Sequence, residues 1–180
     1  MKAMVVMLLV VCAGVGVAAQ QLTIGRAAPE ISAAEWINCS GPLSLTQQRG
    51  KAMVVCFFST TDERSLRAIF EMKRMQQQFT KKGVTFVALT DQDRVKGEVN
   101  RFVTRHKITF PVGTGSPSRN QYLVAKGSYA FVVDRAGVLV WKGAPEKGLL
   151  AGIELALNRA RGEAAATNVT RKVTTRVPEK

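Results

Sequence analysis

Histidine and cysteine are scarce in this sequence of 180 residues, which contains one histidine, His106, and three cysteines, Cys12, Cys39 and Cys56. Structural metal sites commonly need several histidine and cysteine ligands at short spacings. So few of these residues cannot supply such a set, and we expect no metal and no other cofactor. The low cysteine content also restricts redox chemistry, because disulfide exchange requires a thiolate.

Acidic residues are half as frequent as basic ones, 13 against 26, which gives a net charge of +13 at neutral pH. The basic residues are spread over the chain, and aromatic residues are not interleaved with them. Proteins that bind single-stranded nucleic acid combine basic residues with aromatic stacking platforms, so we expect no nucleic acid partner. We interpret the charge as a solvated surface, and the alternative is weak contact with anionic membrane or envelope material.

Residues 1–19 have the pattern of an export signal. Lys2 precedes an apolar stretch, Met4–Ala19, which ends in small residues suited to cleavage before Gln20. The stretch is shorter than the roughly 20 residues of a membrane-spanning helix. We therefore expect a periplasmic or secreted protein, and an uncleaved N-terminal membrane anchor is the alternative.

The rest of the chain reads as one domain, residues 20–161, followed by a basic tail, residues 162–180, that we expect to be disordered. Residues 22–50 look irregular, and residues 113–118 look like a loop. From apolar runs and helical periodicity, strands are predicted at 53–58, 84–89, 129–133 and 138–141, and helices at 62–82, 94–106 and 146–161. Two strand–helix–strand units and a hairpin predict a three-layer α/β/α sandwich with a mixed central sheet and helices on both faces.

Several short motifs resemble the thioredoxin-like redoxin family, which includes exported TlpA- and ResA-type thiol–disulfide proteins and the AhpC/TSA group. They occur in the family's order between Gly25 and Gly143. The matching segments are Ala28–Ile31, Leu43–Leu45 with Gly50-Lys51, Phe57–Thr60, Phe110–Val112 and Phe131–Gly137. The resemblance implies a thioredoxin-like fold and, for a typical member, thiol–disulfide exchange.

The residues that carry this chemistry in the family are missing. Where the family has Cys-x-x-Cys, this chain has Asp62 and Ser65, and the family's cis-proline position is occupied by Ser128. A cis peptide before a residue other than proline costs about 2.5–4 kcal/mol, so we expect a trans bond before Ser128. We expect no catalytic residue at this degenerate site.

Two interpretations of the degenerate site remain. In the first, the region is an ordinary helix start, with a capping box formed by Thr60 and Glu63. In the second, the groove still binds an extended peptide or a protein without reacting with it. The candidate groove residues are Thr61, Asp62, Ser65, Ser128 and Tyr129.

The remaining candidates are individual side chains. Cys56 lies in an apolar run and is expected to be an inert core thiol. Cys39 is the one candidate redox thiol, and a Cys39–Cys56 disulfide is an alternative that demanding geometry disfavours. His106 closes an apolar helical stripe, so we expect a half-buried structural histidine.

Two functions from different classes are therefore open. The first is a redox-inactive, thioredoxin-like binding module for a protein or peptide. The second is an enzyme, a thiol–disulfide oxidoreductase or peroxiredoxin-like antioxidant that uses Cys39 or the cysteines of a partner. The residue chemistry favours the binding module, and the sequence leaves the oligomeric state open.

Overall fold

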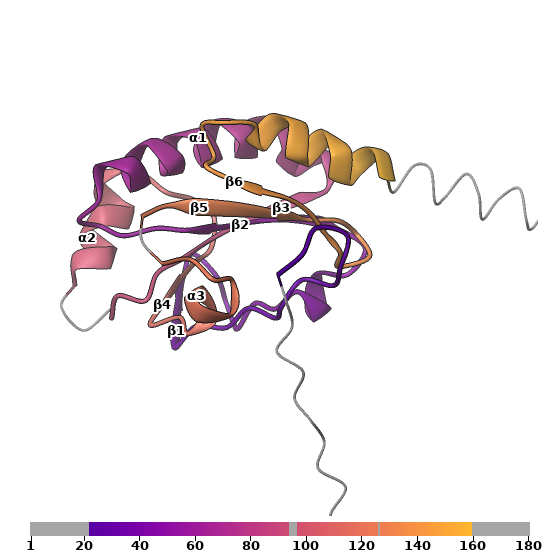
Figure 1. Cartoon of the computed structure of the whole chain (residues 1–180). Coiled ribbons are helices and arrows are strands. Elements are labelled where there is room, and N and C mark those ends of the chain that lie inside the picture. Colours follow the sequence, from indigo (N-terminus) through magenta and orange to yellow (C-terminus); the bar gives the residue numbers. More distant parts are fainter. Residues whose placement is uncertain (1–21, 94–96, 126, 160–180) are drawn as a thin grey trace, which may run out of the picture.

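A six-stranded mixed sheet forms the centre of the computed structural model, which describes residues 22–93, 97–125 and 127–159 (Figure 1). The strand order is β1-β4-β3-β2-β5-β6. The strands are β1 Glu35–Ile37, β2 Ala52–Phe57, β3 Val84–Leu89, β4 Val112–Thr114, β5 Tyr129–Val133 and β6 Leu139–Gly143. The helices are α1 Glu63–Phe79, α2 Glu98–Arg105 and α3 Ser118–Gln121, with short 3₁₀ turns η1 Thr46–Gln48 and η2 Thr80–Lys82 and a C-terminal helix at residues 149–159.

The sheet contains both parallel and antiparallel pairs, and the sequence predicted their arrangement only in part. β2 pairs with β3 and β3 with β4 in parallel, so the second strand–helix–strand unit ends at β4. β5 instead lies antiparallel to β2 and forms the predicted hairpin with β6. β1 lies in a segment that was expected to be irregular and is held by antiparallel pairing with β4, most of which falls in the expected loop; no element was predicted for the stretch that forms α3.

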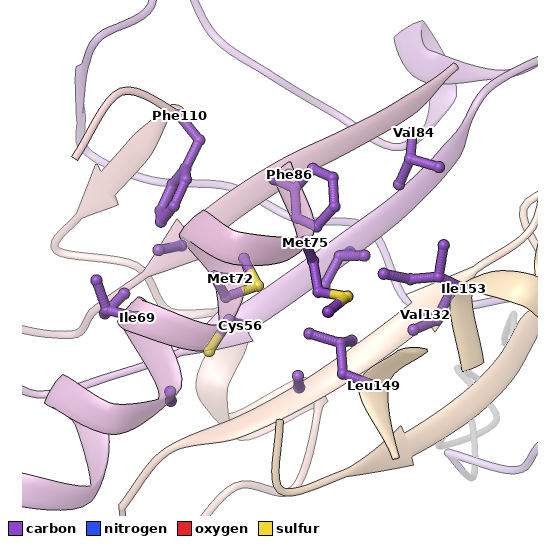
Figure 2. Packing of buried hydrophobic residues seen from close by; sticks show 14 of the residues in the cluster. Cys56, Ile69, Met72, Met75, Val84, Phe86, Phe110, Val132, Leu149 and Ile153 are labelled. Carbon is purple, nitrogen blue, oxygen red and sulfur yellow. The ribbon is translucent and has the colours of Figure 1, made fainter. Parts of the chain in front are cut away.

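One face of the sheet is covered by helices. α1, α2 and the C-terminal helix share one apolar cluster with alternate side chains of β2 and β3. Figure 2 shows Met72 and Met75 of α1 directed toward the sheet, with Leu149 and Ile153 of the C-terminal helix beside them. Removal of this apolar surface from water is the main contribution to the stability of the layer.

The opposite face has a different cover. Its core contains Phe57 and Phe131 of the sheet, Ile31 and Leu45 of the N-terminal segment, and Tyr122 just after α3. The N-terminal segment and the short α3 therefore form the third layer, where longer helices were expected. The predicted three-layer sandwich is confirmed, with this correction to its second face.

Helix boundaries differ from the predictions at places with clear local causes. Gly97 has a φ of 65°, so α2 begins at Glu98 rather than at residue 94. Residues 94–96 lie outside the described part of the chain. The last helix begins at residue 149, because residues 145–148 form a turn. In this helix Leu150 is 40% exposed, whereas Ala156 is fully buried.

The expected signal at residues 1–19 and the expected tail at residues 162–180 lie outside the described residues. Within residues 22–93, 97–125 and 127–159, no helix has both the length and the apolar character needed to cross a membrane.

Candidate functional site

The start of α1, directly after the central strand β2, is organised around Asp62. Asp62 is the N-cap residue, and its carboxylate accepts a hydrogen bond from the Arg64 backbone amide at 3.2 Å. Such a cap satisfies one of the free amide groups at a helix start. The predicted capping box at Thr60 is wrong, because Thr60 lies before the cap. Its amide and hydroxyl instead bind the side chain of Gln92.

Ser65 lies beneath this cap and not in a groove. Its side chain is fully buried. The hydroxyl accepts a hydrogen bond from the Ser59 amide at 2.9 Å and donates one to Asp62 Oδ2 at 3.3 Å. Ser65 therefore joins the end of β2 to the first turn of α1, and its assignment to a surface groove is corrected.

A buried arginine that the sequence analysis did not identify ties the same region together. Arg119 extends from α3, and its residue surface is only 9% exposed. Its Nη2 donates to the carbonyl of Phe58 at 3.1 Å, and its Nη1 donates to the carbonyl of Gly127 at 3.3 Å. Nε has no hydrogen-bond partner and lies 3.6 Å from a carboxylate oxygen of Asp91. One guanidinium thus connects the end of β2 with the segment that precedes β5.

Gly127 and Ser128 lie opposite the cap of α1. A Cβ placed on Gly127 would lie 3.5 Å from Asp62 Oδ2, so the two segments are in close contact. The described residues contain no cis peptide bond, and the bond between Gly127 and Ser128 is therefore trans.

Three hollows are lined in part by Ala125 and by Gly127, Ser128 and Tyr129. The polar hollow, about 540 Å³, is lined by Ser59, Asp62, Arg64, Asp91, Arg119, Ala125 and Gly127. The cationic hollow, about 560 Å³, is lined by Arg64, Arg67, Gly127, Ser128, Tyr129, Ala144, Glu146 and Lys147. The apolar hollow, about 330 Å³, is lined by Leu22, Tyr122, Leu123, Val124, Ala125, Tyr129, Phe131 and Lys142.

The three hollows adjoin one another through shared lining residues. Arg64 and Gly127 line both the polar and the cationic hollow. Tyr129 lines both the cationic and the apolar hollow, and Ala125 lines both the apolar and the polar hollow. The arrangement has the size and the mixture of apolar and polar walls that a small ligand or a few peptide residues require.

Three of the five predicted groove residues reach these hollows. Asp62, Ser128 and Tyr129 line them, and Ser65 is buried below. Thr61 lies in a separate hollow of about 260 Å³ beside α2. No short motif marks Arg119 as part of the site, because it is brought there only by packing of α3.

The two thiols of the described chain are free, and neither cysteine lines any of the three hollows. Cys56 is fully buried, and burial raises the pKa of its thiol to about 12. Its prediction as a core thiol is confirmed. Cys39 is half-buried, and its thiol donates to the Gly41 carbonyl at 3.0 Å. The alternative of a Cys39–Cys56 disulfide is wrong for this structure.

His106 is the C-cap residue of α2 and lines none of the three hollows. Its ring is half-buried and contacts those of Phe102 and Phe70, at centroid distances of 4.6 and 5.9 Å. Its half-buried position matches the prediction. Within the described part of the chain, no group of three or more histidine, cysteine or acidic side chains is placed to hold a metal ion.

Solved structures confirm the fold. A Chlorobium tepidum protein described as thiol:disulfide interchange protein DsbE is 22% identical, with a TM-score of 0.66 over 76% of this chain and 99% of that chain. A second thiol:disulfide interchange protein from that organism is 20% identical, with a TM-score of 0.61 over 77% of this chain and 99% of the other. The thioredoxin domain of a Bacteroides vulgatus thiol-disulfide oxidoreductase is 18% identical, with a TM-score of 0.62 over 73% of this chain and 97% of that chain.

Sequence comparison gives the family. No curated protein sequence matches the chain. The sequence model of the AhpC/TSA family matches residues 24–142, which is more than half of the chain and covers all six strands except the end of β6. The resemblance seen in the sequence motifs is therefore confirmed: this chain is a member of the AhpC/TSA family with a thioredoxin-like fold.

Proposed function

We propose that this chain is an exported, thioredoxin-like binding protein that carries out no disulfide exchange at the family's usual site. The observation that carries the proposal is the composition of the β2–α1 junction. Asp62 and Ser65 stand at its helix start, and both side chains are engaged in hydrogen bonds that hold the junction together. A carboxylate and a hydroxyl cannot form or break a disulfide.

The thiols that the chain does contain are poorly suited to replace this chemistry. Cys56 is fully buried, and its raised pKa keeps the thiol protonated at neutral pH. Cys39 lies after the edge strand β1 and lines none of the three hollows. Neither thiol is placed beside the start of α1, where the helix dipole would stabilise a thiolate.

The three hollows support binding of a protein or an extended peptide. Two hydrogen bonds from Arg119 attach the segment that carries Gly127 to the end of β2. A site that is already ordered loses less conformational entropy when a ligand binds. We assign the binding role to Asp62, Ser128 and Tyr129, together with Arg64 and Arg119, which line the same hollows.

Export is part of this proposal and is supported by the sequence of residues 1–19, with an N-terminal membrane anchor as the alternative. The alternative function is thiol–disulfide or peroxidase chemistry through Cys39. The observation that favours this alternative is that the Cys39 thiol is only half-buried and forms no disulfide.

The test is reduction of insulin disulfides and of peroxide by residues 20–180, beside the Cys39→Ser variant. We expect no turnover above the uncatalysed rate from either protein. Turnover that disappears in Cys39→Ser would establish the oxidoreductase instead. A double variant, Asp62→Cys with Ser65→Cys, is the positive control for the scaffold, because it restores two thiols at the start of α1. We expect that variant to gain insulin reduction.

A further inference from the structure

The cationic hollow has an excess of positive charge. Arg64 and Arg67 project from the first turns of α1, and Lys147 lies in the turn after β6, against a single carboxylate, Glu146. All four residues are exposed. Among the described residues, Arg64, Arg67 and Lys147 form no salt bridge with any acidic side chain, Glu146 included. Their charges are therefore available to a ligand in the hollow.

The adjoining apolar hollow offers a different kind of contact. Its walls include the side chains of Tyr122 and Phe131, and Tyr129 separates it from the cationic hollow. At its rim, Leu123 is 74% exposed and has a φ of 54°. A branched side chain rarely adopts this left-handed conformation. Residues held in such conformations are concentrated at ligand-binding sites.

We propose that the occupant of these two hollows is an acidic peptide segment that carries an apolar side chain next to its carboxylates. The apolar side chain enters the hollow between Tyr122 and Tyr129, and the acidic side chains face Arg64, Arg67 and Lys147. This inference rests on the proposed binding function and names the chemical class of its ligand.

The charge of the whole chain favours the same class of ligand. A net charge of +13 attracts acidic partners over distances of about a Debye length and accelerates their association. Contacts between exposed charges give modest energies, so the apolar anchor is needed to hold the segment in place. An acidic peptide supplies both contacts, whereas an anionic vesicle surface supplies mainly charge.

The experiment measures binding of fluorescent peptides to residues 20–180 by anisotropy. The probes are a peptide with one leucine beside a run of glutamates, a matched peptide with glutamines, and a matched peptide with lysines. We expect the glutamate peptide to bind at least about tenfold more tightly than the glutamine peptide, and to lose affinity as salt is raised. Vesicles of anionic lipid are tested as competitors and should not displace it.

A matched pair of charge reversals locates the site. Arg67→Glu combined with Lys147→Glu should weaken binding by about tenfold. Lys81→Glu combined with Lys82→Glu, on the exposed η2 turn at the opposite end of α1, changes the net charge by the same amount and should weaken binding much less. Equal binding of all three peptides would overturn the acidic class but leave the binding function intact. Absence of binding by every peptide would overturn both, and displacement by vesicles would assign the cationic hollow to a lipid surface.

Discussion

At the scale of single residues, Asp62 contributes to both the fold and the candidate site. One of its carboxylate oxygens caps α1, and the other accepts the hydrogen bond of the buried Ser65 hydroxyl. The same side chain lines the polar hollow, opposite Gly127. The start of α1 in this chain therefore holds a polar group that is already bound to its neighbours.

The capping role of Asp62 predicts a specific loss of stability. Asp62→Ala should lower the free energy of unfolding by about 1 kcal/mol, because it leaves the Arg64 amide without its acceptor. Asp62→Asn keeps an acceptor at the N-cap and should lose much less. Urea denaturation of the two variants and the parent measures the difference. Equal losses in both variants would show that the negative charge, and not the cap, is what stabilises this helix start.

At the scale of elements, the N-terminal segment is attached to the domain by hydrogen bonds as well as by apolar packing. The Tyr122 hydroxyl donates to the Pro29 carbonyl at 2.7 Å, and the Ser118 hydroxyl accepts from the Ser32 amide at 2.9 Å. The Glu30 carboxylate accepts hydrogen bonds from the amides of Leu45 and Thr46 and from the Thr46 hydroxyl. These contacts hold an irregular segment as the third layer of the sandwich.

Glu30 makes this attachment dependent on pH. Burial by itself raises the pKa of its carboxyl, but hydrogen bonds from the Thr46 hydroxyl and the amides of Ile31, Leu45 and Thr46 outweigh burial and lower the pKa. A carboxyl with a lowered pKa stabilises the fold fully above its unfolded value. That contribution is lost as the pH falls through the lowered, folded value.

The corresponding prediction concerns Glu30→Gln. This variant should be less stable than the parent at neutral pH, and the difference should shrink as the pH falls below the ordinary glutamate value. Denaturation midpoints measured over a series of acidic pH values test this. Glu154→Gln, at an exposed position of the C-terminal helix, is the control. A difference that stays constant with pH would mean that the ionised carboxylate of Glu30 is not what holds the segment.

At the scale of the whole molecule, two different layers cover the two faces of the sheet, and one of the two thiols of the described chain lies on each face. Cys56 lies in the cluster under α1 and the C-terminal helix, where Figure 2 shows it beside Met72. Cys39 belongs to the N-terminal segment, packs against the cluster on the opposite face and is half-buried.

Thiol labelling of the native and unfolded protein should therefore separate the two sites. In residues 20–180, we expect Cys39 to react in the native state and Cys56 to react only when the domain unfolds, because its thiol is fully buried and its pKa is raised to about 12. Cys39→Ser should then label at the rate of global unfolding. Rapid labelling of this variant under native conditions would show that the helical layer opens locally.

Much of the central structure could be predicted from local sequence. The runs at residues 84–89 and 129–133 are the strands β3 and β5 as predicted, and the helix after β2 was displaced by only one residue at its start. Short-range apolar patterns indicate these elements because both faces of the strands and one face of the helix are buried. Two of the motifs behind the family resemblance, Phe57–Thr60 and Phe131–Gly137, overlap the ends of β2 and β5.

Elements held by distant contacts were missed. Gly113 suggested a loop, but it lies in β4, where a Cβ would be 2.6 Å from Ala33 Cβ and 2.7 Å from Leu89 Cδ2. The glycine allows close approach of the N-terminal segment to the sheet rather than a turn. Likewise, Ser65 was expected at the surface, because nothing local reveals that its hydroxyl meets the Ser59 amide.

The sequence by itself determined the family, the central strands and the absence of thiols at the start of α1. These follow from residue identities and from patterns only a few residues long. Only the tertiary structure decided which residues surround the candidate site. Arg119 reaches Phe58 and Gly127, and Arg67 and Lys147 line the same hollow, because chain folding brings together segments that are far apart in sequence. Contacts of this kind leave no local pattern, since their energy depends on the packing of the whole domain.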